Sequence, residues 1–266
     1  MNIKSIDFVL LIPCYNNSDG LMASFKSIVY PAEKYEILIV DDGSSIPLNE
    51  NKLMEILPGV KIQVIRLDVN KGIVNALNTG LKKLKSRSDV KYIARLDAGD
   101  LNDEHRFYKQ VALLDTQKEI ALLASWARFE STQSDKGYDY ITQTVHDKIA
   151  TEMHYKCSFI HPSVMFRMEV LDEIGFYPEN FEHAEDYAFF WKILKSYKTA
   201  VIPEKLVYIS FSEKNVSSKN YKKQLQSRAK VVKTFGDQLF HKLLGTAMLR
   251  LKQMIPATII TKLKQL

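Results

Sequence analysis

The chain has 266 residues, of which 46% are hydrophobic and 26% are charged, so it can bury a sizeable core and is not a disordered protein. Its net charge of +6 is modest, and its two cysteines exclude a disulfide scaffold and predict buried free thiols in a reducing compartment. No apolar run reaches the ~18 residues of a membrane-spanning helix, and we expect no signal peptide because Asp7 interrupts the first apolar run.

Strand-like and helix-like segments alternate through the N-terminal half. Short apolar runs predict buried strands, and apolar residues at helical spacing predict the helices between them. The expected strands cover residues 8–12, 37–40, 62–67 and 92–96, and the expected helices cover residues 18–30, 49–57 and 71–85. This alternation indicates a mostly parallel sheet with right-handed crossovers.

The pattern after residue 100 is less regular. We expect helices over residues 104–116, 147–154, 168–174 and 185–196. We expect strands over residues 120–129, 163–167 and 200–210. The polar stretch from Ser131 to Gln143 contains Gly137 and predicts a mobile loop.

The tail of the chain is strongly basic. Residues 213–266 contain ten Lys and two Arg against two acidic residues, a net charge of +10, which leaves −4 for residues 1–212. From Phe240 to Leu266 aliphatic residues alternate with cations at helical spacing, and Pro256 predicts two short helices there. The scarcity of acids favours a helix on an anionic membrane surface; the alternative is a helical hairpin packed on the main domain or on a second subunit.

Two of the predicted strands end in acidic residues. Residues 37–40 lead into Asp41 and Asp42, and residues 92–96 lead into Asp97 and Asp100. Open α/β sheets bind their ligands at this edge, and paired carboxylates suit a divalent cation that carries a diphosphate. Either pair alone is also explained as a cap for the next turn, but together they indicate a nucleotide-diphosphate site.

Six short motifs follow one another between residues 6 and 210. They are Ile12–Asn16, Val40–Ser44, Asn70–Gly72 with Ala76–Gly80, Arg95–Asp100, His161–Arg167 and Ala184–Tyr187. In this order they resemble family 2 glycosyltransferases of the GT-A fold. The resemblance implies a Rossmann-like α/β domain over residues 1–212, with a mostly parallel central sheet flanked by helices. Its nucleotide-binding half would be residues 1–100 and its acceptor half residues 101–212, with residues 213–266 as a basic helical appendage.

The resemblance also implies a function. Such enzymes transfer a sugar with inversion from a nucleotide-diphosphate-sugar, here a UDP-sugar as first choice, to a hydroxyl of a glycan or lipid-linked acceptor. The pathway would be cell-surface polysaccharide biosynthesis, such as that of lipopolysaccharide or capsule. We therefore expect a cytoplasmic protein, peripheral on the inner face of the membrane, with a homodimer through the C-terminal helices as an option. No nucleic-acid partner is expected, because the tail mixes cations with aliphatic rather than stacking aromatic residues.

Two other functions stay open at this point. A nucleotidyltransferase would favour a glycine-rich phosphate loop after the first strand, and residues 13–16 are not one. A non-catalytic subunit that binds sugar nucleotides is made plausible by Gly99, which stands where the family's Asp-any-Asp motif has its second Asp.

The resemblance assigns roles to individual residues. It implies that a nucleotide-binding set lines the nucleoside pocket, contacts the base through Asp42 and reaches the diphosphate. This set is Pro13, Tyr15, Asn16, Asp42, Lys71, Arg95 and Asp97. His161 matches a position near the diphosphate or the acceptor, and Tyr138 and Tyr140 are candidates for stacking on the acceptor.

The metal and the base are implied in the same way. Asp97 and Asp100 would hold Mn²⁺ or Mg²⁺, because Gly99 frees the backbone to re-aim Asp100; otherwise metal binding is weakened, or Asp97 holds the cation with waters. Asp186 matches the general base that removes the acceptor proton, with Glu185 as second choice. Acids in a first helical turn also complement the helix macrodipole without any chemistry.

Overall fold

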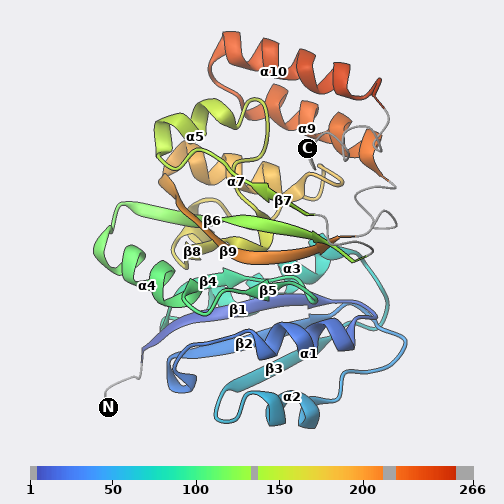
Figure 1. Cartoon of the computed structure of the whole chain (residues 1–266), viewed down its shortest axis with the longest axis vertical. Helices are drawn as coiled ribbons and strands as arrows, with labels where there is room; N and C mark the ends of the chain where they lie inside the picture. The colour runs from blue at the N-terminus through green and yellow to red at the C-terminus, as the bar shows by residue number, and fades with distance from the viewer. Residues whose placement is uncertain (1–4, 133–136, 212–219, 256–266) are drawn as a thin grey trace.

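The computed structural model describes residues 5–132, 137–211 and 220–255, and its centre is a nine-stranded sheet (Figure 1). The strands are β1 (Ile6–Cys14), β2 (Tyr35–Asp41), β3 (Lys61–Arg66), β4 (Val90–Arg95), β5 (Leu101–Asn102), β6 (Ile120–Ser131), β7 (Gly137–Tyr140), β8 (Met165–Arg167) and β9 (Lys198–Phe211). Their order is β3-β2-β1-β4-β8-β6-β9-β5, and β7 pairs with β6.

The first part of the sheet is parallel, as the alternating pattern predicts. β1 pairs in parallel with β2 and β4, and β2 pairs in parallel with β3. The crossovers are the helices α1 (Ser18–Lys26), α2 (Glu50–Ile56) and α3 (Ile73–Lys85). Beyond β4 the sheet becomes mixed, because β8 runs antiparallel to both β4 and β6 while β9 runs parallel to β6. The predicted α/β fold is therefore confirmed.

Two hydrophobic cores lie on the two faces of this sheet. Successive side chains of a strand point to opposite faces, and β1 divides its residues accordingly: Val9 and Leu11 join one core, whereas Leu10 and Ile12 join the other. α3 and α7 (Glu185–Ser196) cover the first core, and α1 and α4 (Arg106–Thr116) cover the second. The remaining short helices are α5 (His146–Glu152) and α6 (Val170–Glu173).

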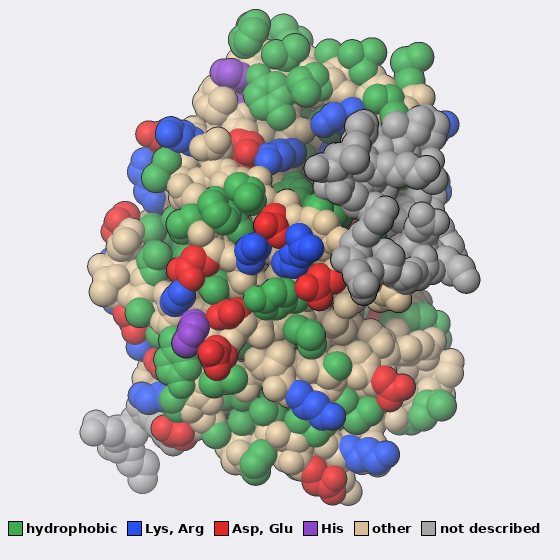
Figure 2. Space-filling model, in the orientation of Figure 1, with side chains coloured by type: hydrophobic (Ala, Val, Ile, Leu, Met, Phe, Trp, Pro, Cys, Tyr) green, Lys and Arg blue, Asp and Glu red, His purple; other side chains and the backbone are tan. Residues whose placement is uncertain are grey.

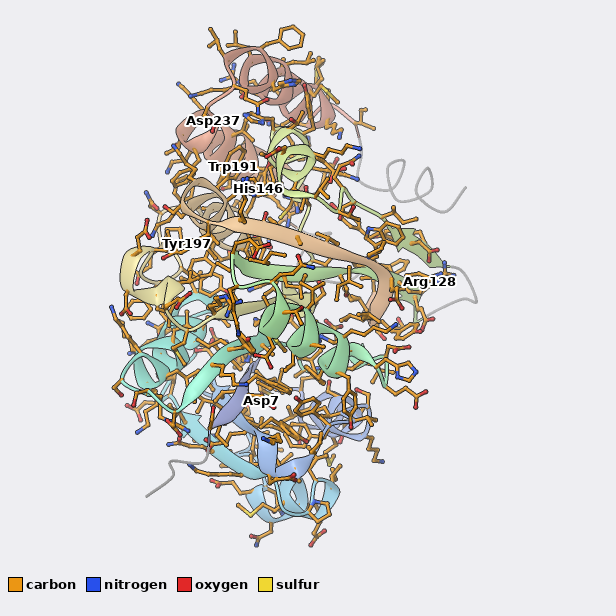
Figure 3. The ribbon with its side chains drawn as sticks, turned by 90° about the vertical axis from the view of Figure 1, so that its left-hand side faces the viewer. Asp7, Arg128, His146, Trp191, Tyr197 and Asp237 are labelled. Atoms are coloured by element: carbon orange, nitrogen blue, oxygen red, sulfur yellow. The ribbon has the colours of Figure 1, made fainter. Side chains whose placement is uncertain are left out.

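The described part of the tail forms two helices that pack on the domain. α9 (Tyr221–Phe235) contributes Leu225 and Val232 to the same core as α7. α10 (Leu239–Lys252) approaches residue 154 so closely that a Cβ on Gly245 would clash with the His154 carbonyl oxygen. Figure 3 shows the labelled Trp191 of α7 on the side of the sheet that faces these helices. α9 and α10 therefore form a hairpin on the domain. The hairpin considered from the sequence lies within residues 240–266, and its second helix, after Pro256, lies outside the described residues, so that alternative stays a prediction.

The prediction of a mobile loop from Ser131 to Gln143 is wrong for part of that stretch. Gly137–Tyr140 form β7, which pairs antiparallel with β6. The Tyr138 ring stacks on Phe129 with centroids 4.9 Å apart and planes 1° from parallel. Aromatic packing across the two strands thus fixes a segment whose composition is polar. Residues 133–136 lie outside the described residues.

Candidate active site

The loops after β1 and β2 are tied to each other at the carboxyl edge of the sheet. The Asn16 backbone N–H donates to Ser44 Oγ at 2.9 Å, and the Ser45 N–H donates to Asn16 Oδ1 at 2.8 Å. Asn16 has a φ of +49°, a left-handed conformation that asparagine tolerates better than most residues. Pro13 is half-buried in β1, and Tyr15 is exposed beside this junction. The nucleoside contacts predicted for Pro13, Tyr15 and Asn16 remain predictions.

The two acids after β2 have different partners. Asp41 accepts the Ser44 N–H at 2.9 Å and pairs with Arg66 at 2.6 Å, so it orients the turn after β2. Asp42 is buried and accepts the N–H groups of Lys71 and Gly72 at 2.8 and 2.9 Å. These bonds fasten the loop before α3, a connection that the sequence does not reveal. A contact of Asp42 or of the exposed Lys71 with a nucleotide remains a prediction.

Asp97–Asp100 form a turn built around glycine. The Asp100 N–H donates to the Asp97 carbonyl at 3.1 Å, and Gly99 has a φ of +107°, a conformation that side chains rarely adopt. The Gly99 N–H also donates to Ser24 Oγ of α1 at 2.9 Å. Glycine at this position therefore has a backbone reason, because an aspartate here would be strained.

A buried guanidinium lies beneath this turn. Arg95 is 1% exposed, and its Nη2 donates to Asp97 Oδ1 at 2.6 Å. Its Nε is buried without a hydrogen-bond partner. The pair is therefore not a surface salt bridge, and burial makes its charges matter more than they would in water.

Asp97 and Asp100 offer two carboxylates on this turn. The Asp97 side chain is 39% exposed, whereas Asp100 is buried at 7% exposure. Burial, and then the charge of Asp97, raise the pKa of Asp100 to about 8. A divalent cation would supply the missing positive charge. Within the described ranges no group of three His, Cys, Asp or Glu side chains is arranged for a metal, so such a cation needs diphosphate and water as further ligands.

A second acidic pair opens α7. Burial, and then the neighbouring Asp186, raise the pKa of Glu185 to about 7. Burial also raises the pKa of Asp186, whose Oδ1 accepts the Tyr187 N–H at 2.7 Å. A helix N-terminus alone would lower both pKa values, so desolvation outweighs the macrodipole here. Carboxylates in this state suit general-base chemistry near neutral pH.

His161 is a half-buried residue at the start of a short helical turn, His161–Ser163. Its Nε2 lies 2.9 Å from the Tyr177 hydroxyl, and its ring packs against Phe190. Burial and the charge of Arg95 hold the pKa of His161 well below its usual range, so the ring is neutral. Arg95 interacts electrostatically with His161, Glu185 and Asp186 as well as with Asp97. The structure thus brings together residues that the sequence separates by ninety positions.

Sequence reasoning missed one charged residue of this region. Arg228 of α9 interacts electrostatically with Asp186, although it lies in the tail outside the predicted motifs. The sequence does contain a signal for this residue. Arg228 lies three positions after Leu225 and four before Val232, a spacing that places the arginine on the same face of the helix as these two apolar residues.

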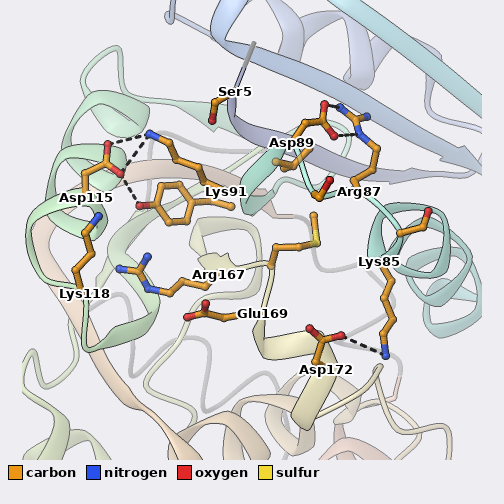
Figure 4. A pocket seen from close by; sticks show the side chains of 15 residues that line it. Ser5, Lys85, Arg87, Asp89, Lys91, Asp115, Lys118, Arg167, Glu169 and Asp172 are labelled. Atoms are coloured by element: carbon orange, nitrogen blue, oxygen red, sulfur yellow. Dashed lines mark hydrogen bonds and ion pairs between the residues drawn. The ribbon is translucent and has the colours of Figure 1, made fainter. Parts of the chain in front are cut away.

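A groove of about 620 Å³ lies elsewhere, where β4 begins and β8 ends (Figure 4). Its charged side chains largely neutralise one another: Arg87 pairs with Asp89, Lys91 pairs with Asp115, and Lys85 lies 3.7 Å from Asp172. This groove is at the opposite end of the strands from the acidic turns, so it is separate from the candidate active site.

The parallel half-sheet, the acidic turns at its carboxyl edge and the acidic pair on α7 define a glycosyltransferase of the GT-A fold. The family model for glycosyl transferase family 2 matches residues 9–175, more than half of the chain, and the chain belongs to this family of nucleotide-sugar-dependent enzymes. The predicted family and enzyme class, EC 2.4, are confirmed. Membership favours sugar transfer over the nucleotidyltransferase alternative.

Relatives and solved structures agree. The chain is 26% identical to the bifunctional glycosyltransferase pgtA of Dictyostelium discoideum, covering 81% of this chain but only 32% of that protein. It is 26% identical to the amylovoran biosynthesis glycosyltransferase AmsE of Erwinia amylovora, covering 76% and 75% of the two chains.

Two solved structures show the same fold. S. aureus TarS 1–349 in complex with UDP-GlcNAc has a TM-score of 0.65 at 16% identity, covering 95% of this chain and 74% of that TarS fragment. The mannosyltransferase PcManGT of Pyrobaculum calidifontis, in complex with GDP-Man and Mn²⁺, has a TM-score of 0.66 at 15% identity. The match covers 94% of this chain and 71% of the PcManGT chain.

Proposed function

We propose that this chain transfers a sugar with inversion from a nucleotide-diphosphate-sugar to a hydroxyl of a glycan or lipid-linked acceptor in cell-surface polysaccharide biosynthesis. The observation that carries the proposal is the convergence of Asp97, Glu185 and Asp186 on the buried Arg95. In this proposal Asp97 acts on the side of the leaving diphosphate, and the pair Glu185 and Asp186 acts on the acceptor hydroxyl. The UDP-GlcNAc bound by TarS supports a UDP-sugar as the first donor to test, and the name of AmsE supports the pathway.

The proposed reaction uses the two sides of the site differently. Asp186 removes the acceptor hydroxyl proton as that oxygen attacks the sugar's anomeric carbon, and the bond from this carbon to the diphosphate oxygen breaks. Glu185 is the second candidate for the base. Asp97 and Asp100 would hold Mn²⁺ or Mg²⁺, which neutralises charge on the departing nucleoside diphosphate when it is bound. Residues 1–212 form the catalytic unit of this proposal, and residues 213–266 form an accessory part.

The test is a screen of nucleotide sugars with the full chain. We expect one of them, first of all a UDP-sugar, to be hydrolysed slowly without an acceptor and to raise the melting temperature in the presence of Mn²⁺. Release of the nucleoside diphosphate is the readout. If no nucleotide sugar is hydrolysed or bound, the proposal fails; binding without any hydrolysis would support the non-catalytic alternative.

We further propose that α10 attaches the protein to the cytoplasmic face of an anionic membrane. Hydrophobic side chains gather at the top of the molecule, over α10 (Figure 2), where Phe240 and Leu243 are 71% and 64% exposed. Lys242 and Arg250 lie on the same helix, and Asp237 is the sole acid from residue 220 to residue 255. Apolar burial and cations together favour an anionic lipid surface. No helix of the described segments is long and apolar enough to cross a membrane.

Serine at both Phe240 and Leu243 is expected to weaken binding to phosphatidylglycerol vesicles by about 100-fold or more, because each large apolar side chain that enters the membrane contributes about 1.5–3 kcal/mol. Vesicle co-sedimentation measures this. Serine at Ile46 and Val69, which are also exposed but lie in loops away from α10, is the matched control and should leave vesicle binding unchanged. Unchanged sedimentation of the Phe240 and Leu243 variant would contradict membrane attachment. If this variant changes its oligomeric state and not its vesicle binding, the exposed apolar residues of α10 belong to a dimer interface.

A further inference from the structure

Tyr177 lies between α6 and α7, and a buried side chain of α3 clamps its backbone. The Asn78 Nδ2 donates to the Tyr177 carbonyl at 2.9 Å, and the Tyr177 N–H donates to Asn78 Oδ1 at 2.9 Å. Both residues are buried, at 5% and 3% exposure. One amide thus donates to and accepts from the same residue, ninety-nine positions along the chain, and this double bond to the backbone fixes where Tyr177 lies.

The Tyr177 side chain is held as firmly as its backbone. Its ring stacks on Phe189 of α7 with centroids 4.2 Å apart, and it lies 5.4 Å from the His161 ring. Its hydroxyl oxygen is 2.9 Å from His161 Nε2, which is the hydroxyl's sole hydrogen-bond partner among the residues that the structure describes. The clamp and the stacked rings therefore aim this hydroxyl at one nitrogen of His161.

The turn that carries His161 is attached to the end of β4. The Val164 N–H donates to the His161 carbonyl at 3.4 Å, and the Arg95 N–H donates to the Val164 carbonyl at 3.0 Å. β4 ends at Arg95, just before the acidic turn at Asp97–Asp100. Backbone hydrogen bonds thus hold the His161 turn beside the strand end that leads into the candidate active site.

The hydrogen bond to Tyr177 decides which nitrogen of His161 carries the proton. A neutral imidazole has one donor and one acceptor nitrogen, and the partner of one nitrogen sets the role of the other. A phenol is a stronger acid than a neutral imidazole N–H, so the hydroxyl donates and Nε2 accepts. Burial raises the pKa of Tyr177, which therefore keeps its proton. Nδ1 of His161 has no partner among the described residues and is not shut off from solvent.

We propose that Tyr177 is a positioning residue that holds His161 as the Nδ1–H tautomer, so that Nδ1 becomes a fixed neutral donor to an oxygen of the bound sugar nucleotide. A neutral donor can bind this oxygen beside Arg95 without adding a second positive charge to a half-buried place. The inference rests on the proposed function. It adds a residue that touches no substrate and acts through the ring that it orients.

The first test is NMR of the histidine ring nitrogens in the full chain, because their chemical shifts distinguish the two tautomers. The signals of His161 are identified by their loss in His161→Gln, and wild type should show a protonated Nδ1. Tyr177→Phe, which removes the hydroxyl alone, should give a mixture of tautomers. Tyr92→Phe is the matched control, since it removes another buried hydroxyl, one that donates to Asp115 at 2.7 Å, and it should leave the His161 signals unchanged.

The second test uses UDP-GlcNAc as the probe. With Mg²⁺ it should move the Nδ1 signal of wild-type His161 without changing the tautomer. Tyr177→Phe should lower the kcat of UDP-GlcNAc hydrolysis by about tenfold, the scale of one lost hydrogen bond, while its KM and the melting temperature stay close to those of wild type. A merely structural role would lower the melting temperature and leave the tautomer and kcat unchanged.

Three results would overturn the inference. They are an Nε2–H tautomer in wild type, the same His161 signals in Tyr177→Phe as in wild type, and an altered tautomer in Tyr177→Phe with an unchanged rate of hydrolysis. An equal change in Tyr92→Phe would also contradict it, because the effect would then come from general packing. If Tyr177→Phe changes the tautomer but wild type neither binds nor hydrolyses any nucleotide sugar, the control of His161 by Tyr177 stands and the proposed function fails.

Discussion

Replacing Asp186 with Asn is expected to lower the kcat of sugar transfer by about 100-fold or more, the scale of general-base catalysis. Asparagine keeps the side chain's shape and can still accept the Tyr187 N–H, so the fold and the donor KM should be unchanged. It cannot take the acceptor proton. Steady-state kinetics with donor and acceptor varied separately measure kcat and the donor KM, and a thermal melt tests whether the fold is unchanged.

The matched variant is Glu185→Gln, which removes the neighbouring carboxylate. The rate should fall as the pH drops through the raised pKa of the base, because only the deprotonated carboxylate accepts a proton. For Glu185 that pKa is about 7, whereas for Asp186 burial raises it from its ordinary acidic value. An active Asp186→Asn enzyme beside an inactive Glu185→Gln enzyme would assign the base to Glu185.

The sequence predicts the parallel half of the fold well because its signals there are local. β1 and β2 are continuous apolar runs, and α3 carries Leu77, Leu81 and Leu84 on a single buried stripe. Each element can be recognised without knowing its neighbours. The acidic turns follow directly from the ends of these strands, so the position of the candidate site is predictable as well.

Features that depend on distant contacts could not be predicted in this way. Tyr138 belongs to a strand because its ring packs on Phe129 and contacts Phe211, which lies far along the chain. Asp42 binds amides nearly thirty residues away. Arg228 approaches Asp186 because α9 folds back on α7. In each case tertiary packing decides the role of a residue whose local pattern is ordinary.

The same contrast explains Gly99. From the sequence, this glycine is a departure from an acidic motif. The structure gives it a backbone role, since its positive φ closes the turn between Asp97 and Asp100. The two carboxylates flank the glycine, so the loss of an acid at position 99 need not mean the loss of a cation site.

Removing divalent cations with EDTA is therefore expected to abolish sugar transfer, and Mn²⁺ or Mg²⁺ should restore it. Asp97→Ala should be inactive, because it removes the exposed carboxylate and leaves Arg95 without its ion pair. Asp100→Ala should be severely impaired, because the turn offers no neighbouring acid at position 99 to compensate. Steady-state kinetics, and Mn²⁺ binding by electron paramagnetic resonance in the presence of UDP, are the two measurements.

The control for both is Asp103→Ala, which removes a carboxylate from the following segment, where it accepts the His105 N–H. It should keep its Mn²⁺ affinity. Loss of Mn²⁺ binding in Asp97→Ala and Asp100→Ala alone would locate the cation on the turn, since a general loss of negative charge would affect all three variants. Full transfer activity in EDTA would contradict the metal assignment. The charge of the leaving diphosphate would then have to be stabilised by protein cations, and the buried Arg95, with its unpartnered Nε, would be the first to test.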